Sequence, residues 1–119
     1  MRGARRETSA VALARSEGRD HREVDFRALL LEALERLREL GIRLPCSGSV
    51  FLKPNVVIGV KATTGITTDP RLVAELISLL KESGVREVHV GDSSAGFQNA
   101  SVARMRKSLI GFEDIAHGG

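Results

Sequence analysis

Three short polar motifs stand where regular elements of the chain are expected to begin or end. They are Leu-Lys-Pro-Asn at residues 52–55, Thr-Thr-Asp-Pro at residues 67–70 and Gly-Asp-Ser-Ser at residues 91–94. Folding alone gives little reason for polar residues at these junctions. In an open α/β sheet, ligands bind beyond the carboxyl ends of the strands. The three motifs are therefore predicted to form one shared site.

Two residues of these motifs, Lys53 and Asp92, are the candidates for catalysis. Lys53 follows an apolar run and could bind a phosphate or carboxylate as a point charge. If its amine were desolvated, it could instead act as a base or form a Schiff base. Asp92 could bind a ribose hydroxyl, coordinate Mg²⁺ through waters or act as a base. Spacing alone leaves the structural alternatives open, in which Lys53 extends to solvent and Asp92 caps a turn.

The other polar residues of the motifs are expected to bind a ligand through hydrogen bonds or close backbone approach. They are Asn55, Thr67, Thr68, Gly91, Ser93 and Ser94. Asn55 could also brace the loop in which it lies. Asp69 is predicted to cap a helix that begins at Pro70, so an anion at that helix end would compete with its carboxylate.

Several common kinds of site are not supported. Gly-Asp-Ser-Ser fits neither the dinucleotide fingerprint nor the phosphate-binding P-loop. Cys46 is the only cysteine, so it forms no internal disulfide and cannot alone hold zinc or an iron–sulfur cluster. No zinc or metalloprotease site is expected, because the histidines lack partners at ligand spacing. His21 and His117 lie near predicted helix ends, where surface roles are expected.

The apolar pattern predicts an α/β fold with a parallel sheet of about three strands and flanking helices. Strands are predicted at residues 9–15, 50–53 and 87–92, and helices from His21 or Arg22 to Leu40 and from Pro70 to the stop at Gly84. The continuous apolar run at residues 50–52 is typical of a strand covered on both faces.

The 119 residues are predicted to form a basic arm at residues 1–8 and a single α/β domain at residues 9–119. Three parallel strands make a poor independent core. The domain is therefore expected to be incomplete at its C-terminus and part of a larger α/β fold, or to cover an open sheet edge as a homo-oligomer.

Composition argues against several partners. The net charge is +3, with arginines gathered in the first 22 residues, but a solvated terminus is favoured over a phosphate-binding arm. Aromatic residues make up 3% of the chain, which argues against a stacking platform for single-stranded nucleic acid. No apolar stretch approaches the length of a membrane span, and no signal peptide is recognised. A cytoplasmic location is expected.

Taken in order, Leu52-Lys53-Pro54-Asn55, Thr67-Thr68-Asp69-Pro70 and Val90-Gly91-Asp92-Ser93 resemble the family called domain of unknown function 362. The resemblance runs from about Ala10 to the C-terminus. The activity of that family is not settled. Some members carry ferredoxin-type iron–sulfur segments after the domain, a role that a chain with Cys46 alone does not share. The family domain is longer than this chain, in line with the expected missing C-terminal portion.

The function favoured by these residues is the binding of a small anionic metabolite at the carboxyl ends of the strands. Whether chemistry follows binding is left open, and the cofactor is unknown. The alternative is a non-catalytic truncated or accessory domain that associates through an open sheet edge. The first hypothesis predicts that the motif residues cluster, and the second predicts oligomerisation.

Overall fold

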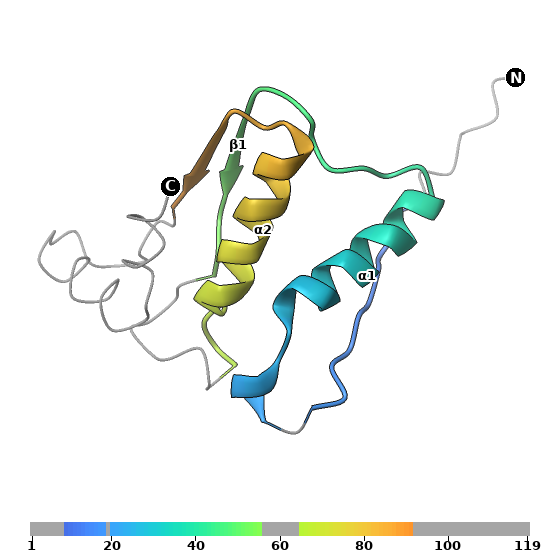
Figure 1. Cartoon of the computed structure of the whole chain (residues 1–119), viewed down its shortest axis with the longest axis vertical. Helices are drawn as coiled ribbons and strands as arrows, with labels where there is room; N and C mark the ends of the chain where they lie inside the picture. Colours follow the sequence, from blue (N-terminus) through green and yellow to red (C-terminus); the bar gives the residue numbers. More distant parts are fainter. Residues whose placement is uncertain (1–8, 19, 56–64, 92–119) are drawn as a thin grey trace, which may run out of the picture.

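The computed structural model describes residues 9–18, 20–55 and 65–91 (Figure 1). Its elements in chain order are η1 (His21–Glu23), α1 (Phe26–Glu39), β1 (Ser49–Leu52), α2 (Pro70–Ser83) and β2 (Glu87–Val90). β1 and β2 pair in parallel, with Val50 opposite Val88 and Leu52 opposite Val90. The predicted α/β class with a parallel sheet is confirmed, and two of its three predicted strands form this sheet.

α2 begins and ends where the sequence predicts. The Asp69 side chain accepts a hydrogen bond of 2.9 Å from the Arg71 N–H, and Pro70 opens the helix. At the other end Gly84 has φ +109°. The Val85 N–H then donates to the Leu80 carbonyl at 3.0 Å, which is the hydrogen bond of a Schellman motif. Apart from Pro54, the buried apolar side chains among the described residues come from α2 and the residue after Gly84: Val73, Leu79, Leu80 and Val85.

α1 begins later than predicted, because two aspartates cap two separate elements. Asp20 accepts from the Arg22 N–H and caps the short 3₁₀ helix η1. Asp25 accepts from the Ala28 N–H at 2.9 Å and caps α1. A side-chain oxygen at each N-cap satisfies a backbone donor that the helix itself leaves unpaired. The predicted stop is confirmed, since Gly41 has φ +80°.

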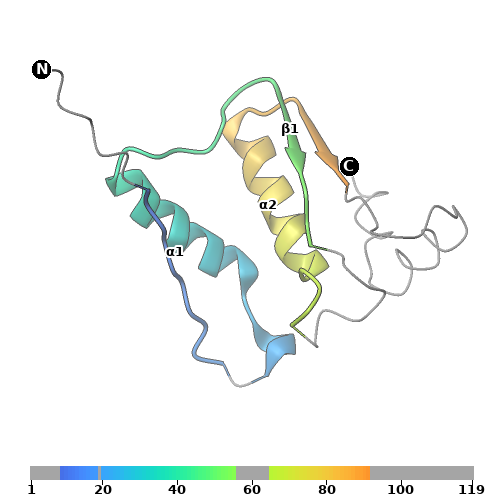
Figure 2. The same ribbon diagram turned by 180° about the vertical axis from the view of Figure 1, so that it is seen from behind.

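The predicted strand at residues 9–15 is not formed. These residues have no regular secondary structure and run along α1, where the Arg36 guanidinium donates to the Leu13 carbonyl at 2.6 Å. The sheet, α2, α1 and this segment follow one another across the molecule (Figures 1 and 2). A strand needs a neighbouring strand to pair its backbone, and the segment lies beside a helix instead.

The expectation that the 50–53 strand is covered on both faces is also wrong for the described structure. Phe51 is 65% exposed, whereas its neighbours Val50 and Leu52 are half-buried. α2 packs on the sheet and α1 packs on α2, so α1 does not cover the opposite face of the sheet. His89, which pairs with Phe51 across the strands, is likewise exposed. None of the helices within the described ranges is long and apolar enough to cross a membrane.

Candidate functional site

The first two motifs are joined directly by hydrogen bonds. The Asn55 N–H donates to Thr68 Oγ1 at 2.9 Å, and the Thr68 N–H donates to the Asn55 carbonyl at 3.0 Å. The side-chain amide of Asn55, through Nδ2, also donates to the Ile66 carbonyl at 3.1 Å. Asn55 therefore braces the loop in front of α2, one of the two roles that the sequence left open.

The third motif begins beside the first. The Gly91 N–H donates to the Leu52 carbonyl at 3.0 Å, which extends the contact between the strands past the end of β2. Gly91 also lies close to Phe51, because a Cβ at this glycine would be 3.0 Å from the ring carbon Cζ. Asp92, Ser93 and Ser94 lie outside the described residues. The described part of all three motifs thus lies at the carboxyl end of the sheet.

The accessibility of the motif residues separates their roles. Lys53 directly follows β1 and is exposed, which suits a cation that meets an anion from solvent. The desolvated amine that a base or a Schiff base requires would need a more buried position. Thr67 is buried, at 5% exposure, whereas Thr68 is half-buried. A threonine hydroxyl that accepts one hydrogen bond can still donate another, so Thr68 retains the chemistry of a ligand contact.

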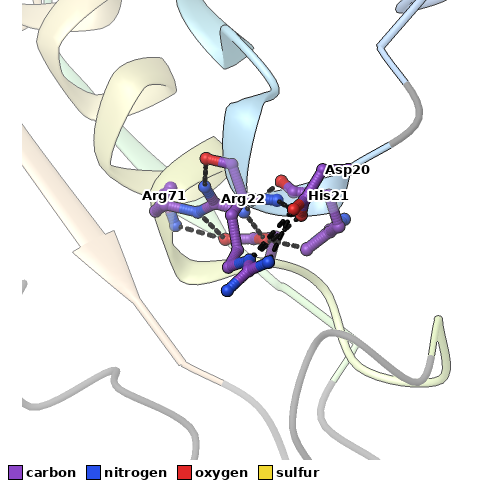
Figure 3. Close-up of polar contacts among 5 residues, drawn as sticks. Asp20, His21, Arg22 and Arg71 are labelled. Carbon is purple, nitrogen blue, oxygen red and sulfur yellow. Dashed lines mark hydrogen bonds and ion pairs between the residues drawn. The ribbon is translucent and has the colours of Figure 1, made fainter.

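A second polar cluster surrounds the first turn of α2, and sequence reasoning missed it. We call it the Asp69 cluster: Asp69, Arg71, His21 and Arg22. Arg71 donates to the two carboxylate oxygens of Asp69 at 3.2 and 2.9 Å. His21 Nε2 lies 2.6 Å from Asp69 Oδ2. Arg71 also donates to the carbonyl oxygens of His21 and Arg22, at 3.0 and 3.1 Å. Figure 3 shows His21 and Arg22 of η1 facing Arg71 of α2.

The electrostatics of this cluster keep Asp69 ionised. Burial raises the pKa of the Asp69 carboxyl, but hydrogen bonds from the Arg71 side chain and N–H and from His21 outweigh burial and lower the pKa below its ordinary value. The pKa of Arg71 is raised, chiefly by its hydrogen bond to Asp69. The Arg71 guanidinium also lies 4.9 Å from the centre of the Phe26 ring, which adds a cation–π contact to α1.

The hydrogen bonds of the Asp69 cluster therefore hold η1 against the start of α2. The predicted capping role of Asp69 is confirmed, and the carboxylate is engaged by Arg71 and His21 as well. His21 is not the plain surface residue that its place near a helix end suggested. Arg71 stands two residues after the cap, a spacing that could have suggested the ion pair. Nothing local in the sequence connects His21 with a residue 48 positions away.

Metal binding has no support in the described part of the chain. Within residues 9–18, 20–55 and 65–91, no group of three or more His, Cys, Asp or Glu side chains could hold a metal ion. Cys46 is exposed and is a free thiol.

Comparison with known proteins identifies a family and no activity. The model of the family described as domain of unknown function (DUF362) matches residues 50–118, which is more than half of the chain. The match begins within β1 and contains all three polar motifs. No curated protein and no solved structure matches the chain.

Proposed function

The chain belongs to the DUF362 family, and we propose that it binds a small anionic metabolite at the carboxyl ends of its strands. One observation carries the proposal. The pairing of Asn55 with Thr68 and of Gly91 with Leu52 brings parts of three polar motifs to the end of the sheet where the exposed Lys53 follows β1. In α/β proteins, ligands bind at the carboxyl ends of the strands.

The charges near the carboxyl end of the sheet favour an anion. Lys53 supplies a positive charge, and Thr68 and Asn55 supply groups that can donate hydrogen bonds. Asp69, on the same loop, would repel an anion if it were unpaired. Its charge is instead offset by the Arg71 guanidinium at 2.9 Å, and its Oδ2 atom lies 2.6 Å from His21 Nε2. The carboxylate therefore opposes the proposed ligand far less than its place in the sequence suggests.

Asp92, Ser93 and Ser94 complete the proposed site as the residues that follow Gly91. Asp92 would supply an acid or base, or a contact to Mg²⁺ through waters, and the serines would supply hydroxyl donors. These two roles for Asp92 differ in a measurable way. If Asp92 holds Mg²⁺, chelation with EDTA should weaken anion binding in the wild-type protein and leave the Asp92→Asn variant unaffected.

The test of the proposal is thermal unfolding with a panel of anions: inorganic phosphate, glycerol 3-phosphate, citrate and acetate. We expect at least one of them to raise the Tm of the wild-type protein. An anion at a hundred times its Kd would add about 2.7 kcal/mol to the free energy of unfolding. In Lys53→Ala the same anion should bind at least roughly tenfold more weakly, a loss of about 1.4 kcal/mol.

Arg43→Ala is the matched control for this test. Arg43 is exposed and lies in the connector before β1, at the opposite end of that strand from Lys53. Arg43→Ala lowers the net charge as much as Lys53→Ala does, so it controls for a general effect of charge. Because Arg43 lies away from the proposed site, this variant should keep the anion response. Equal responses of the wild-type protein and Lys53→Ala would refute the site.

The alternative function is that of an accessory domain that associates through its sheet. The 65% exposure of Phe51, on a face that no described element covers, favours it. Size-exclusion chromatography tests this alternative, since a stable monomer would count against it. The expected cytoplasmic location stays a prediction, which cell fractionation would check.

A further inference from the structure

Residues 10–14 form a segment without regular secondary structure that runs beside α1 (Figure 2), and its two large apolar side chains, Val11 and Leu13, are exposed. Val11 and Leu13 are 80% and 76% exposed, more than any other large apolar residue in the described part of the chain. Ala12 and Ala14, between and after them, are half-buried. Alternation with a period of two residues is the pattern of a β-strand with one covered face. The segment thus has the side-chain pattern of a strand and lacks a sheet.

β1 offers a sheet edge of matching character. β2 pairs with one edge of β1, and no strand among the described residues pairs with the other. An unpaired edge presents a row of backbone donors and acceptors that can pair with a further strand. Phe51, on the face of β1 away from α2, is 65% exposed. The edge therefore combines open backbone groups with an exposed aromatic ring.

The alternation of large and small side chains in residues 10–14 suits a position beside the open edge of β1. Placed beside β1, the segment can set Val11 and Leu13 on the same face as Phe51. Ala10, Ala12 and Ala14 then face the layer occupied by α2, where small side chains leave room for the helix. Contacts between aromatic and aliphatic residues on neighbouring strands stabilise a sheet. The corresponding face of β2 carries Glu87 and His89, so it offers no such apolar surface.

The segment of the same chain is badly placed to reach this edge. α1 lies between the segment and the sheet (Figures 1 and 2). Arg27 of α1 forms ion pairs with Glu82 and Glu75 of α2, at 2.8 and 3.5 Å, and these pairs hold α1 on α2. A segment from a second copy can approach the β1 edge without displacing α1.

We propose that residues 10–14 of one copy add as a strand to the β1 edge of a second copy, and that the exchange is reciprocal. Such an interface uses the same two surfaces on each chain and closes as a two-fold dimer. Backbone hydrogen bonds would supply affinity, and the packing of Val11 and Leu13 against Phe51 would supply register. The proposal gives the accessory alternative a specific partner, a second copy, and does not depend on the anion site.

The oligomeric state in solution tests the proposal, measured by size-exclusion chromatography with light scattering. We expect the wild-type chain to be a dimer and the double variant Val11→Lys, Leu13→Lys to be a monomer. Leu31→Lys, which changes an apolar residue of α1 that is 47% exposed, should remain a dimer. A wild-type monomer at all concentrations, or a dimer that persists in the double variant, would overturn the proposal.

Cross-linking tests the location of the added strand. In a Cys46→Ser background, one chain carries Leu13→Cys and a second carries Phe51→Cys, and the two are mixed with oxidised glutathione. A disulfide between the two chains is expected, since neighbouring strands bring Cα atoms within the roughly 5.5 Å that a disulfide spans. A mixture of Leu31→Cys and Phe51→Cys chains should give none. Failure of the first pair to cross-link overturns the proposed location.

The same variants separate this proposal from the proposed function. Val11 and Leu13 lie outside the polar motifs at the strand ends, so the double variant should keep the anion-induced rise in Tm. If the wild-type protein is a dimer, the double variant is a monomer and both show the anion-induced rise in Tm, both proposals hold. If the anion response is missing from every variant and from the wild-type protein while the dimer behaves as expected, only the anion site fails.

Discussion

The Asp69 carboxylate performs two structural tasks at once. It caps α2 by accepting from the Arg71 N–H, and it holds η1 through His21 Nε2 at 2.6 Å. A buried carboxylate is costly unless charged or polar donors surround it, and Arg71 and His21 supply them. The Thr-Thr-Asp-Pro motif thus combines two roles in our account: its aspartate stabilises the fold, and Thr68 beside it is a proposed ligand contact.

The charge of Asp69 should make stability depend on pH. Because its pKa in the folded protein is lowered from the ordinary 3.8, the ionised carboxylate favours folding. This stabilisation is fully present above the unfolded value and is lost as the pH falls through the lower folded pKa. Asp69→Asn keeps a capping side chain and removes the charge, so it should cost about 1 kcal/mol at pH 7. Asp69→Ala also removes the cap and should cost roughly 2 kcal/mol.

Urea unfolding at pH 7 and at a pH below 3.8 measures these differences. The gap between the wild-type protein and Asp69→Asn should shrink at the lower pH. Asp20→Asn is the control, because Asp20 forms its ion pair with Arg22 in an exposed position and should change stability less. A gap for Asp69→Asn that is the same at both pH values would show that its charge does not stabilise the fold.

Among individual residues, local roles could be predicted from the sequence and distant contacts could not. The capping position of Asp69 is visible because Pro70 and an apolar stripe follow it directly. The contact between His21 and Asp69 spans 48 positions and depends on how η1 lies against the start of α2. The same holds for the bond between Asn55 and Thr68, where the sequence could indicate a polar loop but could not choose between bracing and ligand binding.

At the scale of elements, helix ends were predictable where a single residue determines them. Gly41 and Gly84 both have positive φ and end α1 and α2 at the expected positions. The start of α1 was predicted too early, since Asp20 and Asp25 each suit an N-cap and only the folded chain shows that both are used. The 9–15 strand failed for a different reason. Strand formation depends on a partner strand, which a local apolar pattern does not specify.

The two helix-ending glycines give a matched pair for mutagenesis. A Cβ at Gly84 would lie 2.5 Å from the Cys46 carbonyl oxygen, whereas a Cβ at Gly41 would meet nothing within 4 Å. Gly41→Ala should therefore cost only the left-handed strain of alanine, about 1 kcal/mol. Gly84→Ala adds a backbone clash and should cost clearly more. Equal midpoints of the two variants in urea would contradict the close approach of Cys46 to Gly84.

At the scale of the whole molecule, parallel pairing explains why separated motifs meet. β1 and β2 run in the same direction, so the residues that follow each of them lie at one end of the sheet. This arrangement follows from the order of strand, helix and strand, and it was predictable. Which faces of the sheet are covered could not be predicted from the sequence. The apolar run at residues 50–52 does not indicate that α1 packs on α2, an arrangement in which Phe51 stays exposed.

The measurement that tests the central claim most directly is a titration of ¹⁵N-labelled protein with inorganic phosphate, or with the anion that raises Tm most, followed by ¹H–¹⁵N NMR. The account predicts that the amide signals of Lys53, Asn55, Thr68 and Gly91 shift together with one Kd. In Lys53→Ala these shifts should be lost. Shifts that are confined to the arginine-rich N-terminal residues, or that persist in Lys53→Ala, would contradict a shared anion site at the strand ends.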